Sequence, residues 1–468
     1  MQASRPVPST ADLLISGGDA RIAPDAVSGL NRYGCAPVPD PALLALGSCT
    51  ATPVSVAAYA AADQLRQRLP QTTLADEAAR IGAELLDLCG LSGSEASVEL
   101  AASGTDLHRL AAESALTAGG GLRVVMAEAA ETGSGVPEVL RAATANLHLA
   151  TVALRQPDGS LRPLAEVDAE FCRQVAAGVQ AGSAVLLILT DSSKSGVIAP
   201  SPACALILAQ HNPALRVLVD ACQFRLSPAT VRTYLAHGFE VALTGSKFVG
   251  GPSFSGALLR PRAGTPPVQV SPAALNWGVL LRWEAALTEL RAFRGLPEVA
   301  IADFLREFAA AVQRHLAAHP QLLPLALAPL MRPDFQAEAG WDTVPTVFPF
   351  QVCNAAGERL GLSQLRQLYQ ALPQDAACLP EFESCGWTPA QRQLAAERVQ
   401  LGQPVQCGTG YALRLCASAR LVVAACAPGL PDRASLIART LRALDKVALL
   451  AEKSTGAAES GSTSLISD

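Results

Sequence analysis

Lysine is the residue type that this chain of 468 residues most conspicuously lacks. Its 36 basic residues comprise only four lysines, and the other 32 are arginines. A reaction that needs a deprotonated amine therefore has few candidates, because an arginine guanidinium keeps its proton in proteins. The candidates are Lys194, Lys247, Lys446 and Lys453.

Aromatic residues and excess positive charge are also scarce, and both absences exclude classes of ligand. Aromatics make up 4% of the chain and the net charge is −5, so neither a base-stacking surface nor a nucleic-acid partner is expected. No run of 18 or more apolar residues is present, which predicts no membrane span. The first residues show no basic start followed by an apolar block, so we expect a cytoplasmic protein.

The twelve cysteines are scattered and show no metal-ligand spacing. There is no Cys-x-x-Cys pair, and no cysteine stands near a histidine in a zinc pattern, so we predict no metal site. We expect most of them to be buried free thiols in a reducing compartment.

The pattern of the chain predicts an α/β protein with a large domain and a smaller α+β domain. Residues 1–60 are rich in Pro, Gly and Ser and predict an arm with loops, whereas residues 61–295 alternate helical stretches with short apolar runs. Such alternation is typical of a mostly parallel sheet flanked by helices. We assign residues 296–453 to the small domain and 454–468 to a disordered tail. The clearest predicted strands are Leu122–Met126, Val185–Leu189, Arg216–Val219, Glu240–Thr244 and Gly256–Leu259.

A first candidate segment opens a predicted helix with small and hydroxylated residues. It begins at Ser103 and continues through Gly104, Thr105 and Asp106. Free backbone N–H groups and hydroxyl donors at a helix N-terminus can hold a phosphate. A plain helix N-cap would use the same residues, and this alternative stays open.

Two further segments follow predicted strands. Asp220 ends an apolar strand, where it can hold a cation or simply cap a turn. Lys247 lies between a strand end and a glycine-rich turn, a place where an amine that must lose a proton would be retained. Lys194 is its rival near a strand end, while Lys446 and Lys453 belong to a C-terminal helix, for which we predict surface positions.

Together the three segments predict a pyridoxal phosphate site. A lysine forms a Schiff base with this cofactor, a carboxylate pairs with its ring nitrogen, and a helix N-terminus holds its phosphate. Because parallel sheets place ligands at the carboxyl ends of their strands, the segments are expected to meet there.

At these residues the chain resembles the fold-type I pyridoxal-phosphate enzymes, in their class V aminotransferase and cysteine desulfurase branch. Asp220 and Gln223 match an Asp-x-x-Gln motif, and Thr244 to Pro252 is similar to the family's Ser-Gly-His-Lys-x-x-Gly-Pro. Ser193 to Pro200 is similar to its Asn/Ser-x-x-Gly-x-x-x-Pro. The resemblance covers roughly residues 60 to 450.

The resemblance implies a role for each matching residue and a homodimer. Lys247 would carry the Schiff base, Asp220 would pair with the ring nitrogen, and Gln223 would contact the ring hydroxyl. Arg414 would grip a substrate carboxylate, with Arg420 in reserve. The remaining implied positions are phosphate contacts and ring neighbours, at Ser103, Gly104, Thr105, Ser193, Thr244, Ser246 and, at the partner subunit's phosphate, Asn276.

The chain departs from the family pattern in three places. Residues 127–134 contain no histidine or aromatic to stack on the ring, and His108 could substitute, although we expect it to lie exposed on its helix. Leu401 stands where a desulfurase would have its cysteine. In the arm, Asn31 and Tyr33 either reach the cleft, where they would bind substrate, or pack across a dimer.

These observations predict an aminotransferase whose small-molecule substrate is an amino acid or amine that carries a carboxylate. A pyridoxal-phosphate lyase that cuts a C–S, C–C or carboxyl bond, desulfurase-like enzymes included, is the alternative, because the same scaffold permits it. A non-catalytic scaffold that binds the cofactor is the third.

Overall fold

The structure is a computed structural model, and it describes most of the chain. The described residues are 8–92, 95–116, 120–262, 267–270, 276–333, 335, 340–427 and 432–453. The predicted tail, 454–468, lies outside them.

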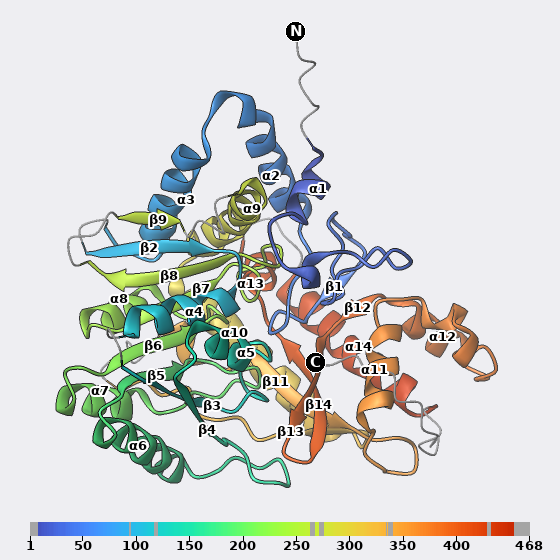
Figure 1. Cartoon of the computed structure of the whole chain (residues 1–468). Helices are drawn as coiled ribbons and strands as arrows, with labels where there is room; N and C mark the ends of the chain where they lie inside the picture. The colour runs from blue at the N-terminus through green and yellow to red at the C-terminus, as the bar shows by residue number, and fades with distance from the viewer. Residues whose placement is uncertain are drawn as a thin grey trace.

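An eight-stranded sheet forms the centre of the larger part of the molecule (Figure 1). The strand order is β4-β3-β5-β6-β7-β8-β2-β9. The first five strands in this order (β4, β3, β5, β6 and β7) are parallel to one another. Strand β8 runs antiparallel to both of its neighbours, and β9 is parallel to β2. The prediction of a mostly parallel sheet is thus confirmed. The strands are β2 (Ala96–Ala101), β3 (Leu122–Ala127), β4 (Leu147–Val152), β5 (Ala184–Thr190), β6 (Arg216–Ala221), β7 (Glu240–Thr244), β8 (Gly256–Pro261) and β9 (Val268–Val270).

Helices cover both faces of this sheet, which explains why its strands are apolar on both sides. Within β5, Leu186 and Ile188 face one core, and Val185, Leu187 and Leu189 face the other, as the two-residue period of a strand requires. The first core lies under α4 (Gly104–Ala115) and α5 (Val136–Ala143). The second lies under α2 (Val56–Arg68), α3 (Leu74–Leu88), α6 (Leu164–Gln180), α7 (Pro202–His211), α8 (Pro228–Ala236) and α9 (Trp277–Arg294).

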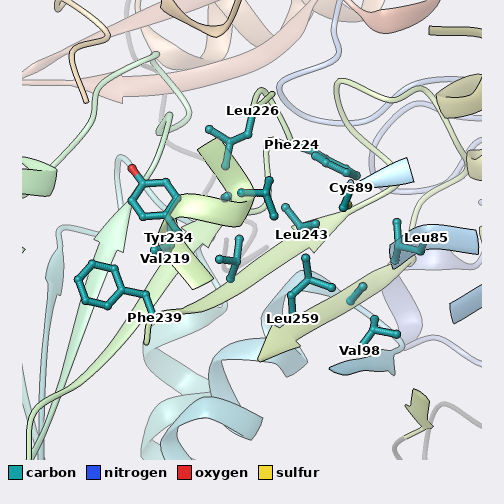
Figure 2. Close-up of a cluster of buried hydrophobic side chains, with 14 of the residues drawn as sticks. Leu85, Cys89, Val98, Val219, Phe224, Leu226, Tyr234, Phe239, Leu243 and Leu259 are labelled. Atoms are coloured by element: carbon teal, nitrogen blue, oxygen red, sulfur yellow. The ribbon is translucent and has the colours of Figure 1, made fainter. Parts of the chain in front are cut away.

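Figure 2 shows part of the second core, where side chains from strands and helices interleave. Val219, Leu243 and Leu259 extend from neighbouring strands toward Leu85 and Tyr234 of the covering helices. Burial of this apolar surface fixes the register of the strands, because a slip of one residue would turn the side chains to the other face. The strand ends that carry polar residues are therefore held in place by the core beneath them.

A second, antiparallel sheet belongs to the C-terminal part, in the order β10-β11-β14-β13. It packs with its helices around a separate core that contains Phe304, Phe348 and Leu413. The strands are β10 (Leu322–Pro324), β11 (Val347–Val352), β13 (Gly402–Cys407) and β14 (Gly410–Cys416). The helices are α10 (Glu298–Ala318), α11 (Leu362–Ala371), α12 (Pro389–Ala396), α13 (Ala419–Cys426) and α14 (Arg433–Ala451).

The predicted surface position of Lys446 is wrong. Its side chain is fully buried on α14, and its amine donates to the carbonyl oxygens of Leu372 at 3.0 Å, Gln374 at 2.9 Å and Glu397. These carbonyl groups stand where α11 and α12 end, and they need donors. Burial lowers the pKa of Lys446 to about 8. Lys453 is exposed, as predicted.

The N-terminal segment crosses between the two sheets. It contains α1 (Thr10–Leu14), which packs on α2 and α9, and β1 (Leu44–Ala45), which pairs in parallel with β12 (Val399–Gln400). In Figure 1 this segment lies beside α13 and β12, next to the edge of the large sheet. No helix in the described ranges is both long and apolar enough to cross a membrane.

Candidate active site

The predicted site residues of the large sheet meet at the carboxyl ends of β6 and β7. Asp220 is the penultimate residue of β6, and Thr244 is the last residue of β7. Adjacent pairing of the two strands sets Asp220 opposite Ala242. The strands are parallel, so their polar ends face the same edge.

Asp220 is buried and paired with His108 from α4. The Nε2 atom of His108 lies 3.1 Å from Asp220 Oδ2, and its Nδ1 atom lies 2.9 Å from the carbonyl oxygen of Gly104. Carbonyl and carboxylate oxygens accept hydrogen bonds, so each contact needs an N–H on the ring. We infer that His108 carries both protons and a positive charge.

The charges of the pair reinforce each other. Burial opposes the charged form of His108, but the charge and hydrogen bond of Asp220 outweigh it and raise the histidine's pKa. Burial likewise acts to raise the pKa of Asp220, yet the His108 charge and the Lys247 amine hold that pKa below its usual range. A buried carboxylate is thus kept ionised.

The predicted exposure of His108 is wrong. It lies on the buried face of α4 with Leu107, Ala111 and Ala112. The sequence already indicated this burial, because His108 falls within the apolar stripe of the helix whose N-terminus is the candidate phosphate site. Its spacing of four residues from Gly104 puts the two on one helix face.

Lys247 lies in the turn after β7, close enough for its amine to influence the pKa of Asp220 and His108. The described residues give this amine no hydrogen-bond partner, while its backbone carbonyl accepts from Thr52 Oγ1 at 3.0 Å. The glycines of the turn allow it to press against α9. A Cβ atom on Gly251 would lie 2.5 Å from Cβ of Ala286, nearer than side chains approach.

The N-terminus of α4 adjoins the same strand ends. Ser103 is its N-cap and accepts from the N–H of Asp106 at 3.3 Å. A Cβ atom on Gly104 would lie 2.9 Å from Thr244 Cγ2, so the helix start touches the end of β7. Ser103, Gly104, Thr105 and Thr244 are therefore brought together. Ser246 is buried two residues beyond Thr244.

Gln223 faces the same region from the loop after β6. It is buried, and its Nε2 donates to the carbonyl oxygen of Cys49 at 3.0 Å. Its Oε1 has no hydrogen-bond partner among the described groups. The next residue, Phe224, has a φ of 53°, and Ser192 and Phe254 near the site have φ of 64° and 70°. Such strained backbone clusters at functional sites.

Ser193 belongs to a buried polar network centred on Glu131. Its hydroxyl donates to Glu131 Oε2 at 2.6 Å, and so does that of Ser195. Arg155 completes the network with an ion pair to Glu131 at 2.8 Å. Glu131 lies in the loop after β3, where the family that the chain resembles has its ring-stacking residue. In this chain, Glu131 links that loop to the Ser193 loop by hydrogen bonds instead.

Arg414 is buried on β14 and bonded to neutral oxygens. It donates to the carbonyl oxygens of Lys194 at 3.2 Å and Gln403 at 2.6 Å, and to Thr50 Oγ1 at 3.0 Å. Its Nε has no hydrogen-bond partner, and no described carboxylate forms an ion pair with it. Arg420, the predicted reserve, is by contrast paired with Glu289 at 3.7 Å.

Three further predicted residues lie in the N-terminal segment and at the start of α9. The Asn31 Oδ1 accepts from the N–H groups of Tyr33 and Cys35, which closes a local turn. The Tyr33 ring lies 6.3 Å from that of Phe254. Asn276 is the N-cap of α9, where it accepts from Val279 N. Their roles toward substrate or cofactor stay predictions.

Comparison with known proteins is informative only at the level of structure. No family model and no curated protein matches the sequence. A cysteine desulfurase from Thermococcus onnurineus is similar with a TM-score of 0.55 and 11% identity, over 87% of this chain and 94% of that one. The cysteine desulfurase CsdA from Escherichia coli is similar with a TM-score of 0.52 and 13% identity, over 87% and 94%.

A third similar structure is the glutamate decarboxylase domain of a Vibrio parahaemolyticus transaminase and decarboxylase. Its TM-score is 0.52 at 14% identity, over 87% of this chain and 80% of that one. The chain has the fold of the fold-type I enzymes. The predicted fold class is therefore confirmed, and at these identities the similarity speaks for the fold alone.

Proposed function

We propose that the chain is a pyridoxal-phosphate-dependent enzyme acting on an amino acid or amine. The observation that carries the proposal is the buried Asp220–His108 pair beside the N-terminus of α4. It faces the amine of Lys247, which has no hydrogen-bond partner in the part of the chain that the structure describes. A carboxylate kept ionised in a buried position requires a cationic partner. His108 is one such partner, and because each carboxylate oxygen can accept more than one hydrogen bond, Asp220 can also accept from the protonated pyridine nitrogen.

The other residues of the site fit the same cofactor. Gln223 Oε1, which has no hydrogen-bond partner among the described groups, can accept from a ring hydroxyl, and the N-terminus of α4 offers N–H donors and a positive dipole to a phosphate. When bound, pyridoxal phosphate supplies an electron sink for charge that develops next to the substrate nitrogen.

Within this proposal the chain's own groups divide the work. Asp220 would hold a proton on the ring nitrogen of the cofactor. His108 fixes the carboxylate from the side of α4 and keeps it ionised. Lys247 would hold the cofactor through its amine and would move a proton to and from the substrate.

Arg414 is proposed to bind the substrate carboxylate. Its guanidinium is buried and, among the described residues, has neither a carboxylate partner nor a hydrogen-bond partner at Nε, so it is suited to bind a carboxylate. Its position between Lys194 and Thr50 sets it between the two sheets, so substrate binding would draw on both.

For the reaction, we favour bond cleavage over transfer of the amine. Two of the similar structures are cysteine desulfurases and the third is the decarboxylase domain of a transaminase and decarboxylase, which supports the lyase alternative over the aminotransferase that the sequence suggested. Leu401 is buried in the core of the small sheet, and this speaks against a desulfurase that carries sulfur on that loop. Amino transfer remains the second candidate, because Arg414 would bind the substrate carboxylate in either reaction. From the family resemblance we also expect a homodimer.

The first test is the visible spectrum of the purified full-length protein after incubation with pyridoxal phosphate. A yellow absorption band is expected that is lost in Lys247→Ala and kept in Lys194→Arg, the matched lysine near a strand end. A colourless wild-type protein that retains no cofactor would contradict the proposal. A coloured protein that turns over no amino acid would leave the non-catalytic scaffold as the better description.

The second test distinguishes the two reactions. The loaded protein is incubated with single amino acids, and released CO2, sulfide and ammonia are measured beside conversion of the cofactor to its amine form. Release without conversion supports a lyase. Stoichiometric conversion to the amine form, reversed by a keto acid, supports an aminotransferase.

A further inference from the structure

Two free thiols meet where the N-terminal segment crosses β14. Cys49 and Cys416 pack together with Val347 in a small buried cluster. Two hydrogen bonds hold the segments side by side. The backbone N–H of Cys416 donates to the Leu46 carbonyl at 2.8 Å, and the Ser48 hydroxyl donates to the Ala417 carbonyl at 2.8 Å. The pair is thus fixed by the surrounding structure.

Buried positive charge surrounds this pair without a carboxylate to balance it. Arg225 and Arg414 are both buried, and each has an Nε–H without a partner among the described groups. The remaining N–H groups of Arg225 donate to Thr346 Oγ1, Ser48 Oγ and the carbonyl of Ala417, which are all neutral. Two guanidinium groups in such surroundings favour an anion nearby.

The sulfur of Cys49 is in the right place to be that anion. A Cβ atom built on Gly402 would lie 2.5 Å from Cys49 Sγ and 3.2 Å from Arg414 Nε, so the thiol and the guanidinium are neighbours across this glycine. The other ionisable groups that face Cys49 are Cys416, Arg225 and Tyr369. With Arg414 they make four groups, of which Arg414 and Arg225 are cations.

The electrostatics agree with this geometry. Burial acts to raise the pKa of Cys49, but the hydrogen bond from Cys416 and the charges of Arg414 and Arg225 lower it to about 6. Burial and the neighbouring Cys49 raise the pKa of Cys416 well above its ordinary value. These shifts favour the thiolate form of Cys49 and the protonated form of Cys416.

We propose that Cys49 and Cys416 form an oxidisable thiol pair that reacts with a hydroperoxide. The Cys49 thiolate attacks the terminal hydroxyl oxygen of the hydroperoxide, the O–O bond breaks, and Cys49 becomes a sulfenic acid. The leaving oxyanion takes up a proton to become an alcohol, or water when the oxidant is hydrogen peroxide. Cys416 then attacks the Cys49 sulfur, the S–O bond breaks, and the hydroxyl leaves as water with the Cys416 proton. Each hydroperoxide is reduced by two electrons, and each thiol pair becomes one disulfide.

The disulfide would join the N-terminal segment to β14 at the side of Arg414. It would also remove the thiolate that faces the guanidinium, so the charge available to a substrate carboxylate would change. The thiol pair exists whether or not the chain binds pyridoxal phosphate, since neither cysteine is among the residues assigned to that cofactor.

The chain offers a matched control in Cys172 and Cys204. Their sulfur atoms lie 3.6 Å apart between α6 and α7, so this pair is also close enough to be compared. Its surroundings differ, because burial and the carboxylate of Asp168 raise the pKa of Cys204. In both pairs the two cysteines pack against each other, but the arginine side chains that lower the pKa of a thiol lie beside Cys49.

The experiment is oxidation of the full-length, reduced protein by one equivalent of hydrogen peroxide, followed by alkylation and peptide mass spectrometry. Hydrogen peroxide is chosen because Cys49 is 2% exposed and a larger reagent would report access rather than ionisation. A Cys49–Cys416 disulfide is expected to form before a Cys172–Cys204 disulfide. In Cys416→Ser a sulfenic acid on Cys49 should be trapped by dimedone added as the oxidised protein is unfolded, and Cys49→Ser should leave Cys416 reduced.

The pH dependence separates an activated thiol from a merely close one. The rate of Cys49 oxidation should rise with a midpoint near pH 6 in the wild type. It should stay near that value in Arg414→Lys and rise by about one pH unit or more in Arg414→Gln. Earlier oxidation of Cys172–Cys204, or a wild-type midpoint above pH 8, would overturn the proposal.

Discussion

The two halves of the candidate site are built in different ways. The half that contains Asp220, Thr244 and Lys247 lies at the ends of neighbouring strands, and these residues fall within 28 positions of the chain. The half that contains Arg414 is assembled from β14, the N-terminal segment and the Lys194 loop. One half follows from sheet topology, the other from long-range contacts.

The difference predicts how each half should fail. A substitution in the strand half removes a group that the proposed cofactor needs, while the core beneath still holds the backbone. A substitution in the Arg414 half changes substrate affinity and the contact between the two sheets. The following predictions test this contrast, from the largest expected effect to the smallest.

Replacement of Lys247 by arginine should abolish turnover. Arginine keeps the positive charge near Asp220 but cannot lose the proton that attachment of the cofactor requires. The yellow band and product release are measured together. Because Lys194→Arg should retain both, measurable turnover in Lys247→Arg would assign the amine to another residue.

Asp220→Asn should lower kcat by about 10²–10³, the usual cost of removing one preorganised charged group from an active site. The amide matches the carboxylate in shape but cannot hold a proton on the ring nitrogen. Initial rates at saturating substrate provide the measurement. A kcat within threefold of wild type would remove Asp220 from the site.

Arg414→Lys should raise KM for a carboxylate substrate by about tenfold to a hundredfold and change kcat less. A charge-assisted hydrogen bond contributes about 1.5–3 kcal/mol, and lysine cannot reproduce the two-pronged contact. Arg420→Lys is the control, because Arg420 is already paired with Glu289. An unchanged KM in Arg414→Lys would exclude Arg414 from substrate binding.

His108→Gln should cost about 1–3 kcal/mol of unfolding free energy at pH 6 and less at higher pH. The folded state raises the pKa of His108, so its stabilising charge is fully present below the unfolded pKa near 6.5 and is lost as pH rises through the folded value. Denaturant unfolding of wild type and variant over pH 6–9 provides the measurement. A pH-independent difference would contradict the doubly protonated ring, and the histidine NMR signals of the cofactor-free protein give an independent check.

Much of the strand half could be predicted from the sequence. Asp220 and Thr244 follow runs of β-branched and aliphatic residues, and β7 was predicted with its bounds, Glu240–Thr244. His108 could have been recognised from its place in the buried stripe of α4. Its partner could not, because the contact joins residues 112 positions apart through the order of strands.

The Arg414 half could be predicted only by resemblance. The arginine stands in an apolar strand like others in the chain, and nothing near Cys49 indicates that its thiol meets Cys416. Lys446 was misplaced for a similar reason. Its burial depends on the carbonyl groups that α11 and α12 leave without donors at their C-terminal ends. The spacing of residues on α14 does not reveal where those ends lie.

The pairing of the N-terminal segment with the last strands also bears on how the protein is made. Thr50 is hydrogen-bonded to Gln403 and Arg414, which follow it in the chain by 353 and 364 residues. The segment around Thr50 therefore leaves the ribosome long before its partners are synthesised. Closing so long a loop is slow, and unpaired segments are exposed while it is open. During synthesis the strand half would be complete first, and the residues around Arg414 would join it only when the small sheet has folded.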